Sequence, residues 1–230
     1  MIKRILVPLD VSPFAEAVTN TACQVAVRYG AEVNCLTILD APSMEHGQIV
    51  HKGRLGSDRL TDDIARDEQE ASDRLSVVEA KFQAHCEEMN VPCSVLEDRG
   101  VPAKSIVKMA YYYDLVVMGM HSFFRFETNE GEDDTLAKVL AHSVTPMLCV
   151  PEEAPTGFEN VCVIVDDSPD AARANCQFAR FAKAYAPKIT IATSGEDSDS
   201  LDTVVRATMY LKAQGFTNIA KPAHFSDPIK

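Results

Sequence analysis

The sequence has no tryptophan, few cationic side chains and no long apolar run. Its 230 residues include 22 lysines and arginines against 34 aspartates and glutamates, a formal net charge of −12 at pH 7. This acidity disfavours a nucleic-acid partner, because phosphate backbones are bound through Lys and Arg. No apolar segment approaches the ~20 residues that cross a bilayer, and the first apolar run stops at Asp10, too short for an export signal. We therefore expect a cytoplasmic protein that binds neither membrane nor nucleic acid.

The seven cysteines are not spaced for disulfides or for zinc. Their number is odd, no C-x2-C pair occurs, and disulfides are rare in the cytosol. His85-Cys86 with Cys93 has no second ligand pair at zinc spacing, so we expect no metal site. Free cysteine in an apolar run acts as a small buried hydrophobe. Four cysteines lie in such runs and are predicted to be buried in strands: Cys35, Cys93, Cys149 and Cys162.

Motifs of common enzymes are also missing. The chain has no G-x4-G-K-[S/T] phosphate loop, no G-x-G-x-x-G after its first apolar run, no H-E-x-x-H and no G-x-S-x-G. His121 and His142 are available for acid–base chemistry, but no nucleophile is paired with either. The sequence favours a binding protein over an enzyme and predicts no catalytic residue.

Short apolar runs alternate with amphipathic stretches in the first part of the chain. The strands expected from these runs are 2–9, 32–39, 91–97, 115–119 and 147–150. The helices expected between them are 13–29, 61–89, 103–113 and 134–143. Alternating strands and helices imply right-handed crossovers and an open parallel sheet with helices on both faces. The predicted fold class is therefore α/β.

The pattern of the first strand and helix occurs a second time. A D-x-S-P turn ends the first apolar run at 10–13, and a matching D-D-S-P turn ends another at 166–169. The offset of 156 residues also relates Tyr29 to Tyr185, and a constant offset indicates an internal repeat. The domains predicted on this basis are a first α/β domain at 1–150, a linker at 151–157 and a second, incomplete domain of the same type at 158–230.

The second domain is expected to contain only the first three strands of the pattern. Its run V-C-V-I-V at 161–165 is continuously apolar, as a parallel strand buried on both faces should be. With no neighbour on one side this strand would form an open sheet edge, which proteins normally cover. We expect another element, or a longer native chain, to cover it.

Three ordered motifs resemble the universal stress protein family. They are K-R-I-L-V-P-L-D at 3–10, D-L-V-V-M-G-M-H at 114–121 and T-P-M-L-C-V at 145–150. The resemblance covers residues 1–150 and, in shortened form, 158–230. It implies a five-stranded, Rossmann-like sheet in the order 3-2-1-4-5, related to the adenine-nucleotide alpha-hydrolases. It also implies a role in the stress response, and dimers or tandem pairs joined through the last strand.

Many members of that family bind ATP through a G-x2-G-x9-G-[S/T] loop after the fourth strand, while others lack the motif and bind no nucleotide. General topology indicates the same place, since ligands of open α/β sheets bind beyond the strands' carboxyl ends where the strand order reverses. By resemblance, Asp10 would face ribose or Mg²⁺, Ile38 and Met118 would flank adenine, and Gly119 would begin the phosphate loop. The full set of expected site residues is Pro8, Leu9, Asp10, Ile38, Met118, Gly119, His121 and Ser122.

The phosphate loop departs from the family pattern. Ser122 stands where the second glycine belongs, and the later Gly-[Ser/Thr] pair is replaced by Glu132-Asp133 or Asp133-Asp134, depending on the alignment. Carboxylates repel phosphate, by about 4 kcal/mol for two unit charges ~4 Å apart at an effective dielectric of 20. ATP with Mg²⁺ is therefore only the alternative cofactor.

Three features have more than one interpretation. The acidic run 127–134 is either a cation site or a cap for the following helix, and we favour the cap. Asp10 and Asp166 either contact a ligand or shape the turns that follow them. The aromatic residues Phe123, Phe124 and Phe126 form a lid over the pocket, a contact surface, or a patch buried against the neighbouring domain, the last being favoured.

Together these observations predict a cytoplasmic stress-response binding or regulatory protein that does not bind ATP in the usual way. One alternative is an ATP- and Mg-binding member with slow ATPase activity or nucleotide-dependent switching. A second alternative is a dimerisation scaffold. The expected partners are a second copy or the tandem domain itself, with another protein as a further alternative.

Overall fold

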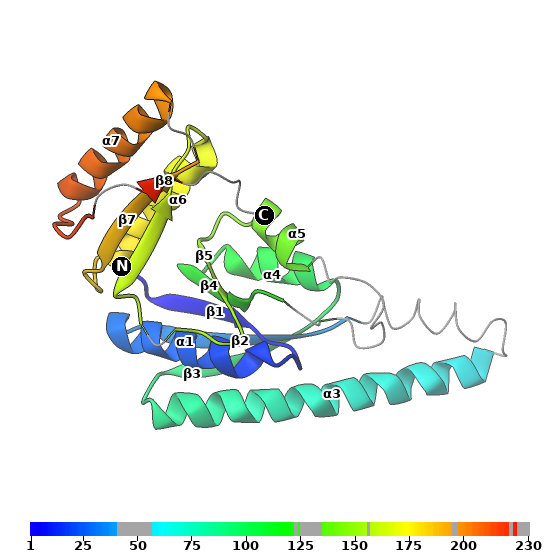
Figure 1. Ribbon diagram of the computed structural model, residues 1–230. Helices are drawn as coiled ribbons and strands as arrows, with labels where there is room; N and C mark the ends of the chain where they lie inside the picture. Colours follow the sequence, from blue (N-terminus) through cyan, green and yellow to red (C-terminus); the bar gives the residue numbers. More distant parts are fainter. Residues whose placement is uncertain are drawn as a thin grey trace. The chain divides into compact units, whose positions relative to one another are not determined.

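A computed structural model describes residues 1–40, 57–121, 124, 135–155, 157–194, 197–220 and 223–224. Contacts divide the chain into a first unit, Ile2–Ala154, and a second unit, Pro155–Lys230, with which Met1 is grouped. Figure 1 labels the helices and strands of both. Each unit has its own β-sheet.

The first unit is built on a five-stranded parallel sheet in the order β3-β2-β1-β4-β5. The strands are β1 (Arg4–Pro8), β2 (Glu32–Leu39), β3 (Cys93–Arg99), β4 (Leu115–Gly119) and β5 (Met147–Val150). This confirms the predicted α/β class and the order 3-2-1-4-5. The chain first runs outward from β1 to β3 and then returns to β4 on the other side of β1. The strand order therefore reverses between β1 and β4.

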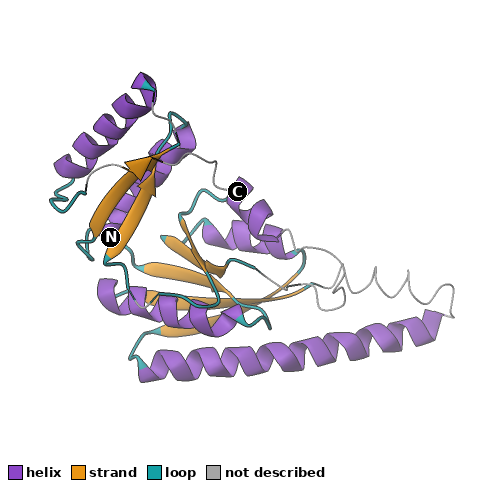
Figure 2. Cartoon of the chain, in the orientation of Figure 1, coloured by secondary structure: helices purple, strands orange, loops and turns teal. Residues whose placement is uncertain are grey.

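Helices cover both faces of this sheet (Figure 2). Helices α1 (Phe14–Tyr29) and α3 (Ser57–Glu88) contact each other on one face, and α4 (Pro102–Ala110) and α5 (Thr135–His142) contact each other on the other. Because both faces are covered, β4 is buried at all five positions, as its continuously apolar sequence predicts. The expected helix at 103–113 ends earlier in the structure, since Tyr111 is the C-cap of α4.

Helix α3 is 32 residues long, and its later part packs on the core. Among its described side chains, those at 65–88, the buried ones are Ala71, Leu75, Phe82 and Cys86. Their spacing of four and seven residues is that of one helix face. No helix in the described part of the chain is long and apolar enough to cross a membrane.

The second unit has a three-stranded parallel sheet in the order β6-β7-β8. Its strands are β6 (Asn160–Ile164), β7 (Lys188–Thr193) and β8 (Ala223–His224), and its helices are α6 (Pro169–Ala182) and α7 (Ser198–Ala213). Ile189, Ile191 and Leu211 are fully buried at the centre of its core. The unit thus has its own hydrophobic core.

The first two strands of the units pair in the same register. Arg4 pairs with Glu32 in the first unit. In the second unit Asn160, 156 residues after Arg4, pairs with Lys188, 156 residues after Glu32. The strand–helix–strand crossover therefore has the same length and register in both units, at the offset that relates their sequences.

Strand β6 differs from the expectation for a buried strand. Among the described residues it pairs only with β7, Cys162 is exposed, and Ile164 is 52% exposed. The prediction of burial was wrong for Cys162 and Ile164 but right for Val163 and Val165, because only one face of the strand is covered here. Of the other strand cysteines, Cys35 is buried, whereas Cys93 and Cys149 are half-buried.

Candidate functional site

The candidate site lies at the carboxyl ends of β1 and β4, where the strand order reverses. Open α/β sheets bind their ligands at this position, because the flanking loops diverge there. Six of the eight predicted site residues line one small cavity here, namely Pro8, Leu9, Asp10, Met118, Gly119 and His121. Ile38 is buried in the core and does not line the cavity, and Ser122 lies outside the described residues.

The cavity bounded by the described residues is small. Its volume is about 10 Å³, which is close to the minimum for one water molecule. Pockets that hold small-molecule ligands usually measure about 300–1,000 Å³. The cavity is also lined by Phe124, which the sequence offered as part of a lid over the pocket, and by four residues that were not among the expected site residues: Ser12, Phe14, Ala15 and Val18. The described residues therefore leave little free space at this point of the sheet edge.

Phe124, five residues after the end of β4, lines the cavity. It is 1% exposed and belongs to the same buried cluster as Ile38 and Met118, the two residues expected to flank adenine. The expectation that this aromatic is buried against the neighbouring domain was wrong for Phe124, because its cluster consists only of residues of the first unit. Phe123 and Phe126 lie outside the described residues.

Phe14 occupies the space beside Gly119. A Cβ atom added to Gly119 would lie 2.9 Å from the Phe14 Cβ and 2.9 Å from the His121 carbonyl oxygen. The ring of Phe14 also lies 5.6 Å from that of His121, tilted by 58°. Position 119 therefore requires glycine because a side chain and a backbone carbonyl approach it closely. In this chain the missing side chain makes room for an aromatic ring.

Asp10 shapes the turn between β1 and α1. It is 5% exposed, and one of its carboxylate oxygens accepts a hydrogen bond from the Ser12 backbone N–H at 2.9 Å. In the second unit Asp166 accepts the same bond from Ser168 at 2.8 Å. The hydrogen bonds from Ser168 lower the pKa of Asp166. Both aspartates therefore have the turn role that was one of their two interpretations.

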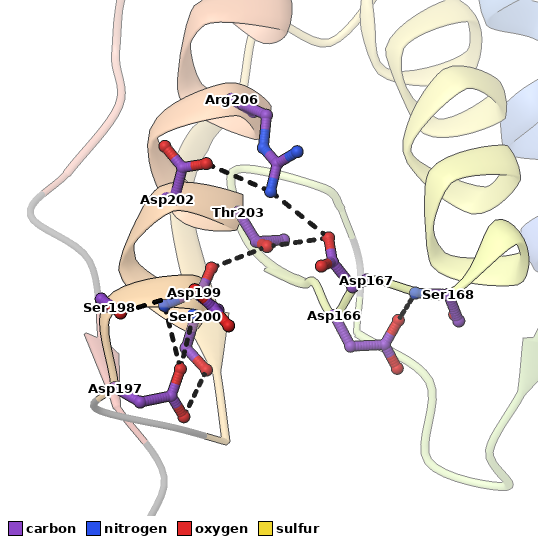
Figure 3. Close-up of polar contacts among 10 residues, drawn as sticks. All are labelled: Asp166, Asp167, Ser168, Asp197, Ser198, Asp199, Ser200, Asp202, Thr203 and Arg206. Atoms are coloured by element: carbon purple, nitrogen blue, oxygen red, sulfur yellow. Dashed lines mark hydrogen bonds and ion pairs between the residues drawn. The ribbon is translucent and has the colours of Figure 1, made fainter.

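The corresponding edge of the second unit is strongly acidic (Figure 3). Asp167, which follows β6, accepts a hydrogen bond from the Thr203 hydroxyl at 3.1 Å and pairs with Arg206 at 3.5 Å. Arg206 pairs at the same time with Asp202 at 3.2 Å. The carboxylates drawn at this edge are Asp166, Asp167, Asp197, Asp199 and Asp202. This edge repels anionic groups such as phosphates.

Two of the side chains at this edge cap helices. Asp197 is the N-cap of α7 and accepts hydrogen bonds from the backbone N–H groups of Asp199 and Ser200, at 3.1 and 2.8 Å, which lower its pKa. Ser168 is the N-cap of α6 and accepts one from Ala171 at 3.1 Å. The helix N-termini that could bind a phosphate are thus already satisfied by side chains.

A much larger open groove of about 1,260 Å³ lies between α1 and α3 in the first unit. Its charged lining is mixed, with Arg74 and Lys81 on α3 and Glu16 on α1. The buried His85 Nε2, also at this groove, has no hydrogen-bond partner within the described part of the chain. The groove also reaches the β1–α1 turn, where Ser12 and Ala15 line both the groove and the small cavity, so it adjoins the candidate site.

The described residues contain no group of three or more His, Cys, Asp or Glu side chains placed to hold a metal ion. The acidic run 127–134 lies outside the described residues, so its two interpretations remain predictions.

The parallel sheet, its reversal between β1 and β4, and the cavity at that point define a Rossmann-like α/β protein. Within this class, the sequence model of the universal stress protein family matches residues 1–151. The match spans more than half of the chain, and the chain belongs to the universal stress protein family.

Solved structures of similar fold come from the same family. A universal stress protein from Archaeoglobus fulgidus DSM 4304 aligns with 96% of this chain and 76% of its own, at 20% identity and a TM-score of 0.62. UspA from Lactobacillus plantarum aligns with 64% of this chain and 97% of its own, at 18% identity and a TM-score of 0.51. A universal stress protein from Archaeoglobus fulgidus in complex with dAMP aligns with 65% and 98%, at 19% identity and a TM-score of 0.39. None of the curated proteins compared matches the chain.

Proposed function

We propose that this chain is a cytoplasmic stress-response binding or regulatory protein that does not bind ATP at its family's usual place. The observation that carries the proposal is the closure of the cavity between β1 and β4 by Phe124 and Phe14. Nucleotide binding there would require Phe124 to leave the core. Returning a buried phenylalanine to water costs up to about 3 kcal/mol, which weakens binding about 100-fold.

Negative charge in the loop after β4 would also weaken nucleotide binding. The loop sequence has Glu132-Asp133 or Asp133-Asp134, depending on the alignment, where the family pattern has Gly-[Ser/Thr], and Arg125 is the single basic residue between 122 and 134. Each carboxylate near a phosphate would raise the free energy of the complex further, although Mg²⁺ would screen part of the repulsion. The buried aromatic rings and the loop carboxylates are different residues, so their effects on nucleotide binding can be tested separately.

Calorimetric titration of ATP with Mg²⁺ tests the proposal. We expect no binding to the parent chain and none or little to either Phe124→Ala or Asp133→Gly/Asp134→Ser alone. The triple substitution should bind. Phe82→Ala is the matched control, because Phe82 is equally buried but lies on α3 and does not line the cavity. Micromolar binding by the parent would refute the proposal and favour the nucleotide-dependent switch.

We also propose that the second unit is a partial repeat of the first, with a linker at 151–157. The shared strand register, the equal crossover length and the same aspartate–serine turn support this. Limited proteolysis of the whole chain should cut first at 151–157 and leave two resistant fragments. A first cut inside β6–α6–β7 would contradict a separately folded second unit.

Self-association is the partnership that we propose. Among the described strands β6 pairs only with β7, and its exposed Cys162 and Ile164 favour pairing with another strand. Light scattering on the reduced chain should give a mass of two chains or more, and Ile164→Lys should lower it. A monomer at all concentrations would exclude the dimerisation scaffold as well.

A further inference from the structure

Four cysteines from four elements gather in the first unit between its sheet and the α1–α3 face. Cys23 of α1 and Cys86 of α3 are both 0% exposed, and their Sγ atoms lie 3.6 Å apart. Burial and the neighbouring Cys86 raise the pKa of Cys93, the first residue of β3, to about 11. Cys35 of β2 lies close enough to Cys86 and Cys93 to interact with both electrostatically. All four are unpaired thiols.

The two closest thiols share a hydrogen bond that makes them unequal. The hydrogen bond with Cys86 lowers the pKa of Cys23, and the bond with Cys23, together with burial, raises the pKa of Cys86. The physical meaning is that the pair loses its first proton more easily than its second, since the remaining thiol donates to the thiolate. A thiolate is the nucleophilic form of cysteine. The pair therefore combines a nucleophile with a second thiol in van der Waals contact.

We propose that Cys23 and Cys86 form an oxidation-sensitive dithiol, which a hydroperoxide converts into a disulfide joining α1 to α3. In the first step the Cys23 thiolate attacks the peroxide, an S–O bond forms, the O–O bond breaks, and the leaving oxygen takes up a proton. In the second step the Cys86 sulfur attacks the sulfenic acid, the S–S bond forms, and the S–O bond breaks with loss of water. In total, two thiols are oxidised to one disulfide and one hydroperoxide is reduced. Hydrogen peroxide gives two water molecules, and an organic hydroperoxide gives one water and one alcohol.

The geometry requires only a small movement. A disulfide has an S–S length of about 2.05 Å, so the sulfur atoms must approach by about 1.5 Å from their present separation of 3.6 Å. Helices α1 and α3 already contact each other, so no element has to be brought in from elsewhere.

The large groove provides the approach to the pair. Asn20 lies one turn before Cys23 on α1, Phe82 lies one turn before Cys86 on α3, and both line the groove. Cys93 is partly exposed. Residues one helical turn from each of the two sulfur atoms therefore line an open groove, so small local motions would admit a peroxide.

The test is disulfide mapping on the whole chain. The reduced protein is treated with stoichiometric hydrogen peroxide, and the remaining thiols are blocked with iodoacetamide. The protein is then digested without reductant by trypsin and Glu-C, and the peptides are identified by mass spectrometry. Glu-C cleaves after Glu87 and Glu88 and so separates Cys86 from Cys93. We expect a peptide linked through Cys23 and Cys86, the loss of two of the seven thiols, and full recovery with dithiothreitol.

Two variants provide the controls. Cys162→Ser/Cys176→Ser removes both exposed cysteines and should leave the link and the thiol loss unchanged. Cys23→Ala should abolish the link and also the rise of several degrees in melting temperature that oxidation produces in the parent. The proposal is wrong if the linked peptides contain Cys162 or Cys176, if Cys86 pairs with Cys93, or if Cys23 and Cys86 react only after the protein is unfolded. The mapping on the parent decides the outcome even if Cys23→Ala does not fold.

Discussion

Replacement of Phe124 by alanine should cost the first unit much of its stability. The ring is 1% exposed and lies in a cluster that includes Met118 and Ile38, so its removal leaves an apolar cavity. Phe→Ala changes in such sites cost about 3–5 kcal/mol. An independent figure comes from area, because a buried aromatic side chain covers about 150–250 Å², which at 25 cal/mol per Å² is about 4–6 kcal/mol.

Urea unfolding followed by far-UV circular dichroism measures this loss. With a slope of about 2 kcal/mol per molar urea, a loss of 4 kcal/mol lowers the midpoint of the first unit's transition by about 2 M. Phe82→Ala, with an equally buried ring on α3, should give a shift of similar size. A loss below about 1 kcal/mol for Phe124→Ala, beside a normal loss for Phe82→Ala, would show that the Phe124 ring is not in the core. That result would refute the claim that the Phe124 ring fills the space at the candidate site.

Three further predictions concern single positions. In the same urea assay, Gly119→Ala should lower the free energy of unfolding by about 1–3 kcal/mol, because the added Cβ would clash with Phe14. An unchanged unfolding midpoint would disprove this close contact. Ser168→Ala should lower amide-exchange protection in α6 by about 1 kcal/mol, whereas Ser198→Ala, which removes no cap, should not. An NMR titration should give the Asp166 carboxyl a pKa below the model-peptide value of about 3.9. Asp166 therefore contributes its full stabilisation above pH ~3.9 and loses it as the pH falls through the lower pKa of the folded protein. A normal pKa in the parent, or no rise in Ser168→Ala, would contradict that assignment.

Local patterns were sufficient to predict the elements of the first unit. β1, β2 and β4 are runs of apolar residues, and α1 ends at Gly30, which adopts φ 60° and satisfies a carbonyl of the last turn. Such signals depend on a few neighbouring residues and therefore appear in the sequence. The strand order came from the family motifs at the ends of β1, β4 and β5.

The features that the sequence could not predict depend on tertiary packing. Phe124 lies in a loop without periodicity, so its sequence context does not distinguish burial from exposure. Phe14 fills the site only because Gly119 lies opposite to it, on another element. The exposure of Cys162 depends on the absence of a second neighbour for β6 among the described strands, and no local pattern reveals a missing neighbour.

Helix α3 is longer than the sheet it covers. At 1.5 Å per residue its 32 residues span about 48 Å, whereas the eight residues of β2 span about 27 Å. Among the described side chains of α3, those at 65–70 are exposed or half-buried, and Ala71 is the first that is buried. An ion pair between Glu68 and Arg99 links this stretch to the end of β3. Amide hydrogen exchange should therefore be faster at 65–70 than at 71–88, where one face of the helix packs on the core.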